Sequence, residues 1–575
     1  MERRVFVAIL LSFAVLYGYQ ALFVPPERPP VDVVEQTARQ GQTPPPPVAS
    51  ATPEPPVEPA PAARISEDTE RNIVVETTTS QVVLTNRGGR ILNWRLKNYL
   101  DEAGGPVDLV PSAVPPEQPK PFTLVVDDQA LSRRLNSSLY RVSGDDAGRV
   151  DARTQARTVT FEYQDEAGLH VRKEFRFEPG NFVVVFSSSV MNAGRELNPV
   201  VAWGPGLGDA GASAGGGSFL TGNLVVPPEA IYHKDGDIER VRSDDIPEQP
   251  AVDGPFRFVG IDDHYFLAAA VNPGDVRAEY APLTLPGEGG TERRFVTASY
   301  RFPRPPQDVR FFVGPKQFDA LQAVDQELVR AIWFGTFGFL AVPLLTALKW
   351  VYAYVGNYGW AIIILTILIN LAIFPLRHKS LVSMRKMQAL QPQLKAIQDR
   401  YAGLKMTDPA RQKMQTEIMS LYKEKGVNPA SGCIPMLLTL PILFAFYSLL
   451  SQAVELRGAS FGWWIKDLSA HDPLYITPVL MALTMFWQQK VTPSAADPQQ
   501  QRIMMMMPLM FGFMFLWAPS GLVLYWFVGN LFAIGQQYFT NWWMGPPPVA
   551  TVRPPAERRI KSAGSARTAG AQNKR

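Results

Sequence analysis

The hydrophobic positions of this sequence form three patterns that follow one another along the chain. Residues 5–24, VFVAILLSFAVLYGYQALFV, are almost continuously apolar, residues 66–314 contain short stretches in which apolar and polar residues alternate, and residues 331–541 contain several more apolar runs. An apolar run of about 20 residues can cross a bilayer as a helix. Alternation with a period of two is typical of strands that bury one face. The pattern predicts a multi-domain membrane protein, with an α-helical transmembrane bundle and an all-β domain.

The first apolar run predicts an uncleaved transmembrane anchor over residues 1–24. A cleaved signal peptide would need a shorter apolar core and a small-x-small cleavage site, and residues 18–24, GYQALFV, offer no good one. Arg3 and Arg4 place the start of the anchor in the cytoplasm, because positive charge favours that side. Residues 25–65 are rich in proline and predict an extended linker outside the cytoplasm.

Residues 66–314 are expected to fold as one antiparallel β-sandwich. Three stretches alternate in the required way: TVTFEYQ at 158–164, LHVRKEFRF at 169–177 and NFVVVFSSSV at 181–190. Glycine-containing breaks separate them, as turns separate the strands of an antiparallel sheet. Because this domain follows the first span, we expect it to be periplasmic.

Two neighbouring apolar runs, residues 331–355 and 360–376, both look able to span the membrane. If both crossed, the segment 377–426, with eleven Lys and Arg against four Asp and Glu, would face outward. The positive-inside bias favours the cytoplasm for such a segment. We therefore expect residues 315–355 to form an interfacial amphipathic helix region and residues 356–377 to form the transmembrane helix.

Residues 432–541 are expected to hold the other four spans, at about 434–453, 474–490, 503–518 and 521–541. Six crossings in total leave both the N-terminus and the tail, residues 542–575, in the cytoplasm. This tail carries seven basic residues and one acidic residue, so its charge agrees independently with that side.

Residues 378–431 are expected to form a cytoplasmic helical hairpin. Apolar residues recur every three or four positions over 378–402, and Asp408 followed by Pro409 is typical of a helix N-terminus. Its outer faces are basic, and the candidate recruiting residues are Arg385, Lys386, Lys395, Arg400, Arg411 and Lys413. Two interpretations remain open: a solvated face attracted to anionic lipid headgroups, and contact with an acidic partner such as a ribosome.

The composition also excludes several kinds of chemistry for this protein. A single cysteine, Cys433, excludes a disulfide framework and a cysteine-based zinc cluster, and the five histidines lack metal-ligand spacing. No hydrolase, metalloprotease or nucleotide-binding motif stands in a sensible context. The spans also lack the buried acids expected of an ion-coupled pump. We therefore expect no enzyme activity, no cofactor, no metal and no specific nucleic-acid sequence as a partner.

A few polar residues and a run of methionines stand out in the spans. Thr366 and Asn370 are about one helical turn apart, so they share a face. Later spans add Thr439, Tyr525 and Asn530. Such residues commonly hydrogen-bond between membrane helices, and the methionine-rich run IMMMMPLMFGFMF at 503–515 could simply be packing. Alternatively, a polar patch beside an adaptable apolar wall suits amphiphilic segments in transit.

Six stretches between residues 355 and 530 match a family pattern in order. They are VGNYGWAIIILT (355–366), VNP (427–429), GCIP (432–435), VELR (454–457), DLSAHDPLYITPVLM (467–481) and PSGLVLYWFVGN (519–530). Through them the chain resembles the YidC/Oxa/Alb family of membrane protein insertases, over a five-span core at about 330–545. The anchor and the β domain match the Gram-negative form of the family, whose periplasmic domain is a β-supersandwich.

The resemblance implies a non-enzymatic insertase and chaperone of the bacterial inner membrane, acting alone and with the Sec translocon. A hydrophilic groove open to the cytoplasm would be lined by Thr366, Asn370, Thr439, Tyr525, Trp526 and Asn530. A hydrophobic slide for the apolar part of a client would comprise Leu437, Met505, Met506, Met510 and Met514. The implied partners are nascent membrane proteins, the lipid bilayer, SecYEG, SecDF, the ribosome and the signal recognition particle receptor.

One groove position departs from the family pattern. The family usually has Arg where Asn370 stands, and Gln is frequent where Thr439 stands. An Asn side chain keeps hydrogen bonding but loses the long-range attraction for acidic client tails. Arg377 lies two turns farther along the same helical face, so we expect it to supply positive charge at the mouth of the groove.

Two other classes of function stay open. One is a solute transporter or channel with an accessory periplasmic binding domain, against which stand the lack of intramembrane acids and of an inverted repeat. The other is a periplasmic enzyme or sugar-binding module anchored by its membrane part. Deleting residues 66–310 would separate the last possibility from an insertase, which should largely survive the deletion.

Overall fold

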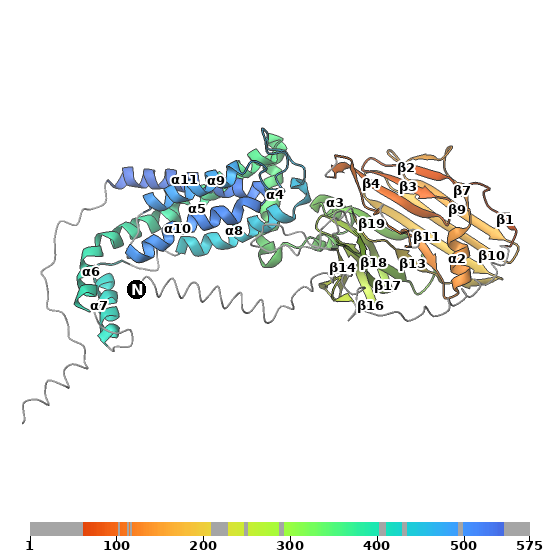
Figure 1. Ribbon diagram of the computed structural model, residues 1–575, viewed down its shortest axis with the longest axis horizontal. Coiled ribbons are helices and arrows are strands. Elements are labelled where there is room, and N and C mark those ends of the chain that lie inside the picture. The colour runs from red at the N-terminus through yellow and green to blue at the C-terminus, as the bar shows by residue number, and fades with distance from the viewer. Residues whose placement is uncertain are drawn as a thin grey trace, which may run out of the picture. The chain divides into compact units, whose positions relative to one another are not determined.

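The computed structural model of the full chain describes the β domain and most of the helical part (Figure 1). The described residues are 61–101, 104–111, 114–115, 118–208, 228–246, 251–286, 292–401, 410–427, 434–492 and 498–545. The predicted anchor at 1–24, most of the proline-rich linker and most of the basic tail therefore lie outside them.

The β domain contains two sheets. The strands of the larger sheet are β1 (Ala63–Ile65), β6 (Thr123–Val125), β7 (Arg141–Ser143), β9 (Arg157–Asp165), β10 (Leu169–Phe177), β11 (Val183–Asn192), β12 (Arg195–Leu197), β13 (Val200–Trp203), β14 (Glu229–Lys234), β15 (Asp237–Arg242), β16 (Ala251–Asp262), β17 (Phe266–Pro286), β18 (Glu292–Arg301) and β19 (Val309–Pro315). Those of the smaller sheet are β2 (Asn72–Glu76), β3 (Ser80–Thr85), β4 (Arg90–Leu100), β5 (Pro106–Asp108) and β8 (Arg149–Asp151). Helix α2 (Gln129–Ser137) also belongs to this domain.

Neighbouring strands pair almost entirely antiparallel. The main path through the larger sheet is β1-β9-β10-β11-β19-β17-β16-β14-β15, and the smaller sheet has the order β5-β4-β3-β2-β8. Only β2 and β8 pair in parallel among the pairs described. The three predicted strand stretches correspond to β9, β10 and β11, which are consecutive neighbours in the larger sheet, so this prediction is confirmed.

The core of the β domain is rich in aromatic rings. The centroid of the Phe122 ring lies between 4.8 and 5.6 Å from those of Phe175, Phe186, Trp203 and Phe311. Such edge-on and tilted contacts add to the large apolar area that each ring buries. The alternating residues of β9 and β10 supply much of this core, because successive side chains of a strand point to opposite faces.

A fully buried lysine interrupts the apolar face of β10. Lys173 is 0% exposed, and its Nζ donates to the backbone carbonyls of Gly88 at 2.7 Å, Gly89 at 3.1 Å and Phe122 at 2.9 Å. An ammonium group has three donors, so three acceptors satisfy it. The lysine thereby ties the turn after β3 and the start of β6 to the middle of the larger sheet.

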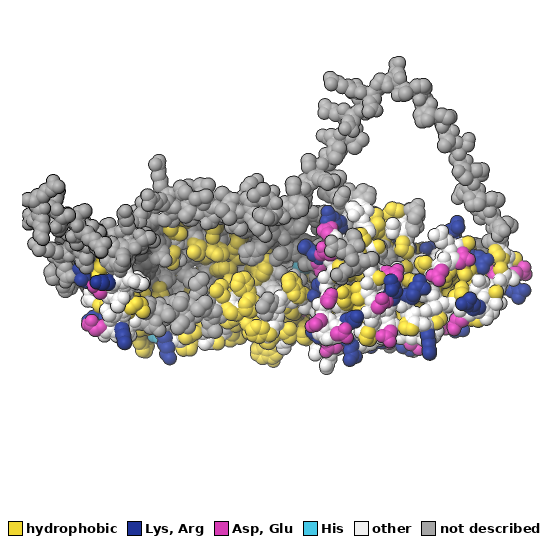
Figure 2. All heavy atoms as spheres, turned by 90° about the horizontal axis from the view of Figure 1, so that it is seen from below, with side chains coloured by type: hydrophobic (Ala, Val, Ile, Leu, Met, Phe, Trp, Pro, Cys, Tyr) yellow, Lys and Arg dark blue, Asp and Glu magenta, His cyan; other side chains and the backbone are white. Residues whose placement is uncertain are grey.

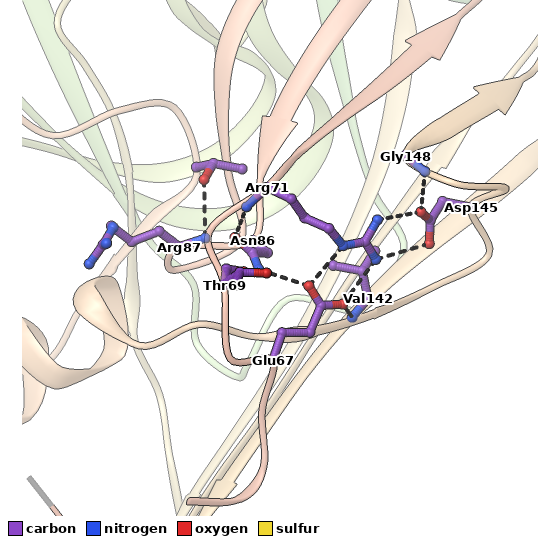
Figure 3. A network of polar contacts seen from close by, with 9 residues as sticks. Glu67, Thr69, Arg71, Asn86, Arg87, Val142, Asp145 and Gly148 are labelled. Carbon is purple, nitrogen blue, oxygen red and sulfur yellow. Dashed lines mark hydrogen bonds and ion pairs between the residues drawn. The ribbon is translucent and has the colours of Figure 1, made fainter.

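A polar network fastens the first described residues to the domain (Figure 3). The Arg71 guanidinium donates to Glu67 at 2.8 Å and to Asp145 at 2.6 Å, and Asn86 Nδ2 donates to the same Glu67 carboxylate at 2.9 Å. Glu67 also accepts from the backbone N–H of Val142. The segment that enters the domain is therefore held by charge-assisted hydrogen bonds from several loops.

The helical part begins directly after β19. Its elements are α3 (Phe318–Val324), η3 (Glu327–Ala331), η4 (Gly335–Phe337), α4 (Gly338–Val355), α5 (Tyr358–Ala389), α6 (Gln391–Arg400), α7 (Ala410–Glu424), α8 (Ile434–Gln452), η6 (Val454–Leu456), α9 (Ile476–Val491), α10 (Pro498–Met514), η7 (Phe515–Trp517) and α11 (Ser520–Met544). Helices α5, α8, α9, α10 and α11 run side by side in a bundle, and α11 packs on α5, α8 and α9 (Figure 1). Helices therefore form at about the places where the four later spans were predicted.

Helix α5 is longer than the sequence suggested. We expected a span ending at residue 377 and one hairpin helix over 378–402, but α5 continues past residue 377 to Ala389 and α6 forms most of the remaining stretch. Pro375 lies inside this helix. A proline removes one backbone hydrogen bond, and in a membrane helix neighbouring groups can satisfy the carbonyl that loses its partner. The helix ends at Leu390, and the new helix α6 then has Pro392 in its first turn.

Two described helices, α4 and α5, are long and apolar enough to cross a membrane. The interfacial position expected for α4 stays a prediction. Many large apolar side chains of the helical part are exposed, and Figure 2 shows them gathered over that part, whereas charged side chains are scattered over the β domain. This distribution fits a bundle that faces lipid.

Candidate functional site

The polar stripe of α5 faces the interior of the bundle. Thr366 is 0% exposed and Asn370 is 5% exposed. The Thr366 hydroxyl donates to the carbonyl of Ile362 at 2.6 Å, and Asn370 Nδ2 donates to the carbonyl of Thr366 at 2.7 Å. These bonds leave Asn370 Oδ1 available as an acceptor.

Arg377 supplies the donor for that acceptor. Its Nη1 lies 2.7 Å from Asn370 Oδ1, so the Arg377 side chain runs back along α5 and meets the side chain of a residue two turns earlier. Within the described part of the chain, no carboxylate forms an ion pair with Arg377. Tyr525 of α11 lies within electrostatic range of the guanidinium. The bundle therefore holds a half-buried cation whose side-chain partner is a neutral amide.

The predicted residues of α11 separate into two groups. Tyr525 stacks on Phe446 of α8 with ring centroids 4.4 Å apart, on the side of Arg377. Trp526 packs instead against Phe515, at 4.9 Å. Successive residues of a helix point about 100° apart, so neighbours in sequence cannot line one site equally. Thr366, Asn370 and Arg377 thus form a hydrogen-bonded series along α5 with Tyr525 near Arg377, whereas Trp526 turns toward the end of α10.

Two other predicted groove residues lie on α11 and α8. Asn530 is 5% exposed, and its Nδ2 donates to the Thr484 hydroxyl of α9 at 3.4 Å. This contact ties α11 to α9. Thr439, near the start of α8, is half-buried.

The C-terminal halves of α5 and α11 are joined by a row of polar contacts that the sequence analysis did not predict. Gln536 Nε2 donates to the carbonyl of Phe374 at 3.2 Å, and His378 Nδ1 lies 3.2 Å from the Thr540 hydroxyl. Farther along, the Arg385 guanidinium donates to the carbonyl of Gly545 at 3.0 Å. The signal was present in the sequence, because Gln536 and Thr540 are polar residues one helical turn apart inside an apolar run.

The candidate recruiting residues of the hairpin fall into different settings. Lys386, Lys395 and Lys413 are exposed. Arg400 pairs with Glu417 at 2.9 Å and so links α6 to α7. Arg385 is 7% exposed and bonded to Asn541 and Gly545, so its side chain faces α11 rather than an outer basic face, contrary to what we expected of its position. The side chain of Arg411 lies outside the described residues.

The methionines of the expected slide form part of an outward apolar face. Met505 is 42% exposed, Met506 69% and Met510 59%. Met514 is half-buried and packs against the core of the bundle. The side chain of Leu437 lies outside the described residues. Helix α10 thus offers a largely unbranched, flexible apolar surface to whatever surrounds the bundle.

The described residues contain no group of three or more His, Cys, Asp or Glu side chains that could hold a metal ion. The residues assembled here can hydrogen-bond, attract an anion and pack against apolar segments.

Comparison with known proteins identifies the family to which the chain belongs. Residues 72–347 match the family model described as "YidC periplasmic domain", and residues 350–545 match the model described as "60Kd inner membrane protein". The membrane protein insertase YidC of Geobacter metallireducens is 36% identical over 553 residues, covering 94% of this chain and 98% of the relative. That of Nitratidesulfovibrio vulgaris is 37% identical over 570 residues, covering 94% and 99%.

A solved structure of an active YidC insertase, with its first transmembrane domain resolved, covers 83% of this chain and 95% of that chain. Its sequence identity is 20% and its TM-score is 0.35, so the assignment rests on the sequence relatives. Their identity extends over both the β domain and the helical bundle, and it brings with it the insertase function, a periplasmic domain and a place in the membrane. The chain belongs to the YidC family of membrane protein insertases.

Proposed function

We propose that this insertase draws the acidic or polar part of a client into its bundle through Arg377, and that the apolar part leaves along α10. The bond between Arg377 Nη1 and Asn370 Oδ1, at 2.7 Å, is the observation that carries the proposal. It brings a cation next to Asn370, the position where the family usually has its own arginine.

The electrostatics of this arrangement favour an incoming anion. A charge away from bulk water interacts with another charge several times more strongly than it would in water. Asn370 is neutral, so it orients the guanidinium without cancelling its charge. A client carboxylate that reached Arg377 could accept two parallel hydrogen bonds, which are the strongest kind available to it. Acidic tails should therefore gain most from this residue.

The outward face of α10 suits the apolar part of the client. Met506 and Met510 are well exposed there, and methionine side chains adapt to many apolar shapes. A client helix would exchange contacts with this face for contacts with lipid at little cost, because lipid tails are equally apolar. The route needs no nucleotide.

The hairpin would recruit clients through its exposed cations, Lys386, Lys395 and Lys413. Arg385 has a positioning role in this proposal, since it fixes the cytoplasmic end of α5 to the end of α11. We further propose an inner-membrane location with both termini in the cytoplasm. The partners would be the ribosome, the signal recognition particle receptor and the translocon components SecYEG and SecDF.

Insertion into proteoliposomes tests the proposal directly. The full chain is reconstituted alone, and a small single-span client is added with either an acidic or a neutral tail. Protease protection of the tail measures translocation. We expect protection above protein-free liposomes for both clients, and a loss of at least several-fold for the acidic client alone in Arg377→Gln.

Lys379→Gln is the matched control, because Lys379 is an exposed cation on the same helix two residues away. It removes the same charge from the cytoplasmic side without touching Asn370. Equal losses in both variants would mean that general surface charge, and not the bundle cation, draws the tail. Normal insertion of the acidic tail by Arg377→Gln would refute the role of Arg377 while leaving the insertase activity in place.

A further inference from the structure

The loop between η6 and α9 presents a tryptophan in an unusual way. Trp463 is 87% exposed, and its backbone has a φ of +52°. A left-handed backbone is strained for a bulky side chain and is normally left to Gly, Asn or Asp. Tyr475, in the same loop, also has a positive φ, of +55°, and is 39% exposed. Strained backbone that aims large aromatic side chains outward is a reason to look for an external contact.

A buried carboxylate holds this loop in shape. Asp472 is 0% exposed and accepts from Trp464 Nε1 at 2.9 Å, from the backbone N–H of Leu474 at 3.0 Å, and from both the N–H and the hydroxyl of Thr477 at 2.8 Å. Trp464 is therefore anchored inward by its indole N–H. The ring of its neighbour Trp463 stacks on the outer side of Trp464, with centroids 5.8 Å apart, and is 87% exposed.

The loop is continuous with the surface of the membrane helices. A Cβ added at Gly359, in the first turn of α5, would lie 2.0 Å from the Phe461 ring, so the loop rests directly on the start of that helix. Trp360, the next residue of α5, is 51% exposed and contacts Phe461 with ring centroids 5.7 Å apart. Trp463 thus extends an aromatic surface that begins at the end of a membrane-spanning helix.

We infer that residues 458–475 form a membrane anchor in which Trp463 inserts into the lipid headgroup region at the end of the bundle where α5 begins and α9 starts. Tryptophan is enriched at that depth because its ring is apolar and its N–H is polar. Lys466 is exposed three residues along and can reach lipid phosphate. The anchor would hold the ends of α5 and α9 at a fixed depth, independently of the route that a client takes.

Fluorine NMR of the full chain tests this contact. The protein is labelled with 5-fluorotryptophan and reconstituted in phosphatidylethanolamine and phosphatidylglycerol vesicles, and the Trp463 resonance is identified by its loss in Trp463→Phe. Lipids with a nitroxide on the headgroup should broaden this resonance at least several-fold more than a gadolinium chelate in the water does. The resonance of Trp94, which is 2% exposed in the β domain, is the reference that neither reagent should broaden.

Two results would overturn the inference. Broadening by gadolinium alone would place Trp463 in water, and broadening by neither reagent would mean that protein, such as a second copy of the chain, covers it. Trp463→Asn supplies an independent check, because Asn accepts a left-handed backbone and preserves the turn. In this variant the lipid nitroxide should broaden Trp464 less than in the parent chain. Unchanged broadening of Trp464 would show that the Trp463 indole does not hold the loop at the membrane.

Discussion

The guanidinium of Arg377 reaches back two helical turns to bond Asn370 at 2.7 Å. The two residues therefore act as one unit: the amide sets the direction of the side chain, and the guanidinium brings the charge. We therefore expect a substitution at Asn370 to change where the charge of Arg377 lies, and a substitution at Arg377 to leave the Asn370 amide without its donor. Four predictions follow from this pair and from three other contacts of the fold.

Exchanging the two residues should restore what either single change removes. Asn370→Leu should weaken the bundle by roughly 1.5–3 kcal/mol, the usual worth of a hydrogen bond to a charged group. The double variant Asn370→Arg with Arg377→Asn returns both a cation and an amide to the same face. We expect it to insert an acidic-tailed client about as well as the parent chain in the proteoliposome assay. Failure of the exchange, with normal insertion of neutral tails, would mean that the depth of the cation matters and not its presence.

Asp263 and His264, in the turn between β16 and β17, should give stability opposite dependences on pH. Burial raises the pKa of Asp263 from 3.8 to about 6, and burial lowers the pKa of His264 from 6.5 to about 4. The contribution of Asp263 is full below its unfolded pKa and is lost as the pH rises through about 6. The contribution of His264 is full above its unfolded pKa and is lost as the pH falls through about 4. Between pH 4 and 6.5, a rise in pH therefore lowers the stability through Asp263 and raises it through His264.

Substituting one of the two residues should reveal how the other one alone makes the free energy of unfolding depend on pH. Asp263→Asn keeps an oxygen for the backbone N–H groups of Tyr265 and Phe266, and its stability should rise by roughly 3 kcal/mol from pH 4 to 6.5. His264→Gln keeps a donor for the carbonyl of Ser451, and its stability should fall by a similar amount over that range. Chemical unfolding of the purified protein across this pH range measures both. Slopes of the same sign in the two variants would contradict the assignment.

Removing the buried amine of Lys173 should destabilise the β domain severely. Lys173→Met fills a similar volume but leaves the carbonyls of Gly88, Gly89 and Phe122 without their donor. Each buried unsatisfied group costs roughly 1–3 kcal/mol, so we expect a loss of several kcal/mol. Arg172→Met, at the exposed neighbouring position of β10, is the matched control and should be nearly neutral. Pulse proteolysis in urea compares the two, and a neutral Lys173→Met would show that water replaces the amine.

Arg385 should hold the end of α5 against α11 and should not take part in recruiting clients. Arg385→Ala removes the bonds to Asn541 and Gly545, so the cytoplasmic end of α5 should separate from α11. Spin labels at positions 395 and 542, where Trp542 is 78% exposed, would then give a broader distance distribution than in the parent chain. Lys386→Ala, which removes an exposed neighbouring cation, should leave the distribution unchanged. If the distance distribution broadened only in Lys386→Ala, Lys386 and not Arg385 would be the residue that holds α5 against α11.

The sequence predicted those features that depend on regular spacing. The strands β9 to β11 follow from the alternation of Val159, Phe161 and Tyr163 and of their counterparts in β10. The burial of Thr366 and Asn370 follows from their shared helical face. In both cases the pattern of side chains is set by the local backbone period, which one sequence is enough to reveal.

The features that the sequence did not predict depend on contacts between distant segments. Nothing near Arg385 in the chain indicates that its guanidinium meets Gly545, which lies 160 positions away. Tyr525 and Trp526 are adjacent, and only the packing of α8 and α10 decides which of them faces Arg377. The bond from Gln536 of α11 to the carbonyl of Phe374, beside Pro375, likewise joins residues 162 positions apart.

The unbroken course of α5 restricts how this protein can evolve. The helix has 32 residues and is about 48 Å long, so roughly a third of it extends beyond a bilayer core of about 30 Å and carries the hairpin. Inserting or deleting one residue between positions 378 and 385 would rotate everything beyond it by about 100° and move it by about 1.5 Å. Arg385 would then no longer face α11, and the hairpin would point elsewhere. Length changes should consequently be rare in this stretch among relatives, even where the side chains themselves vary freely.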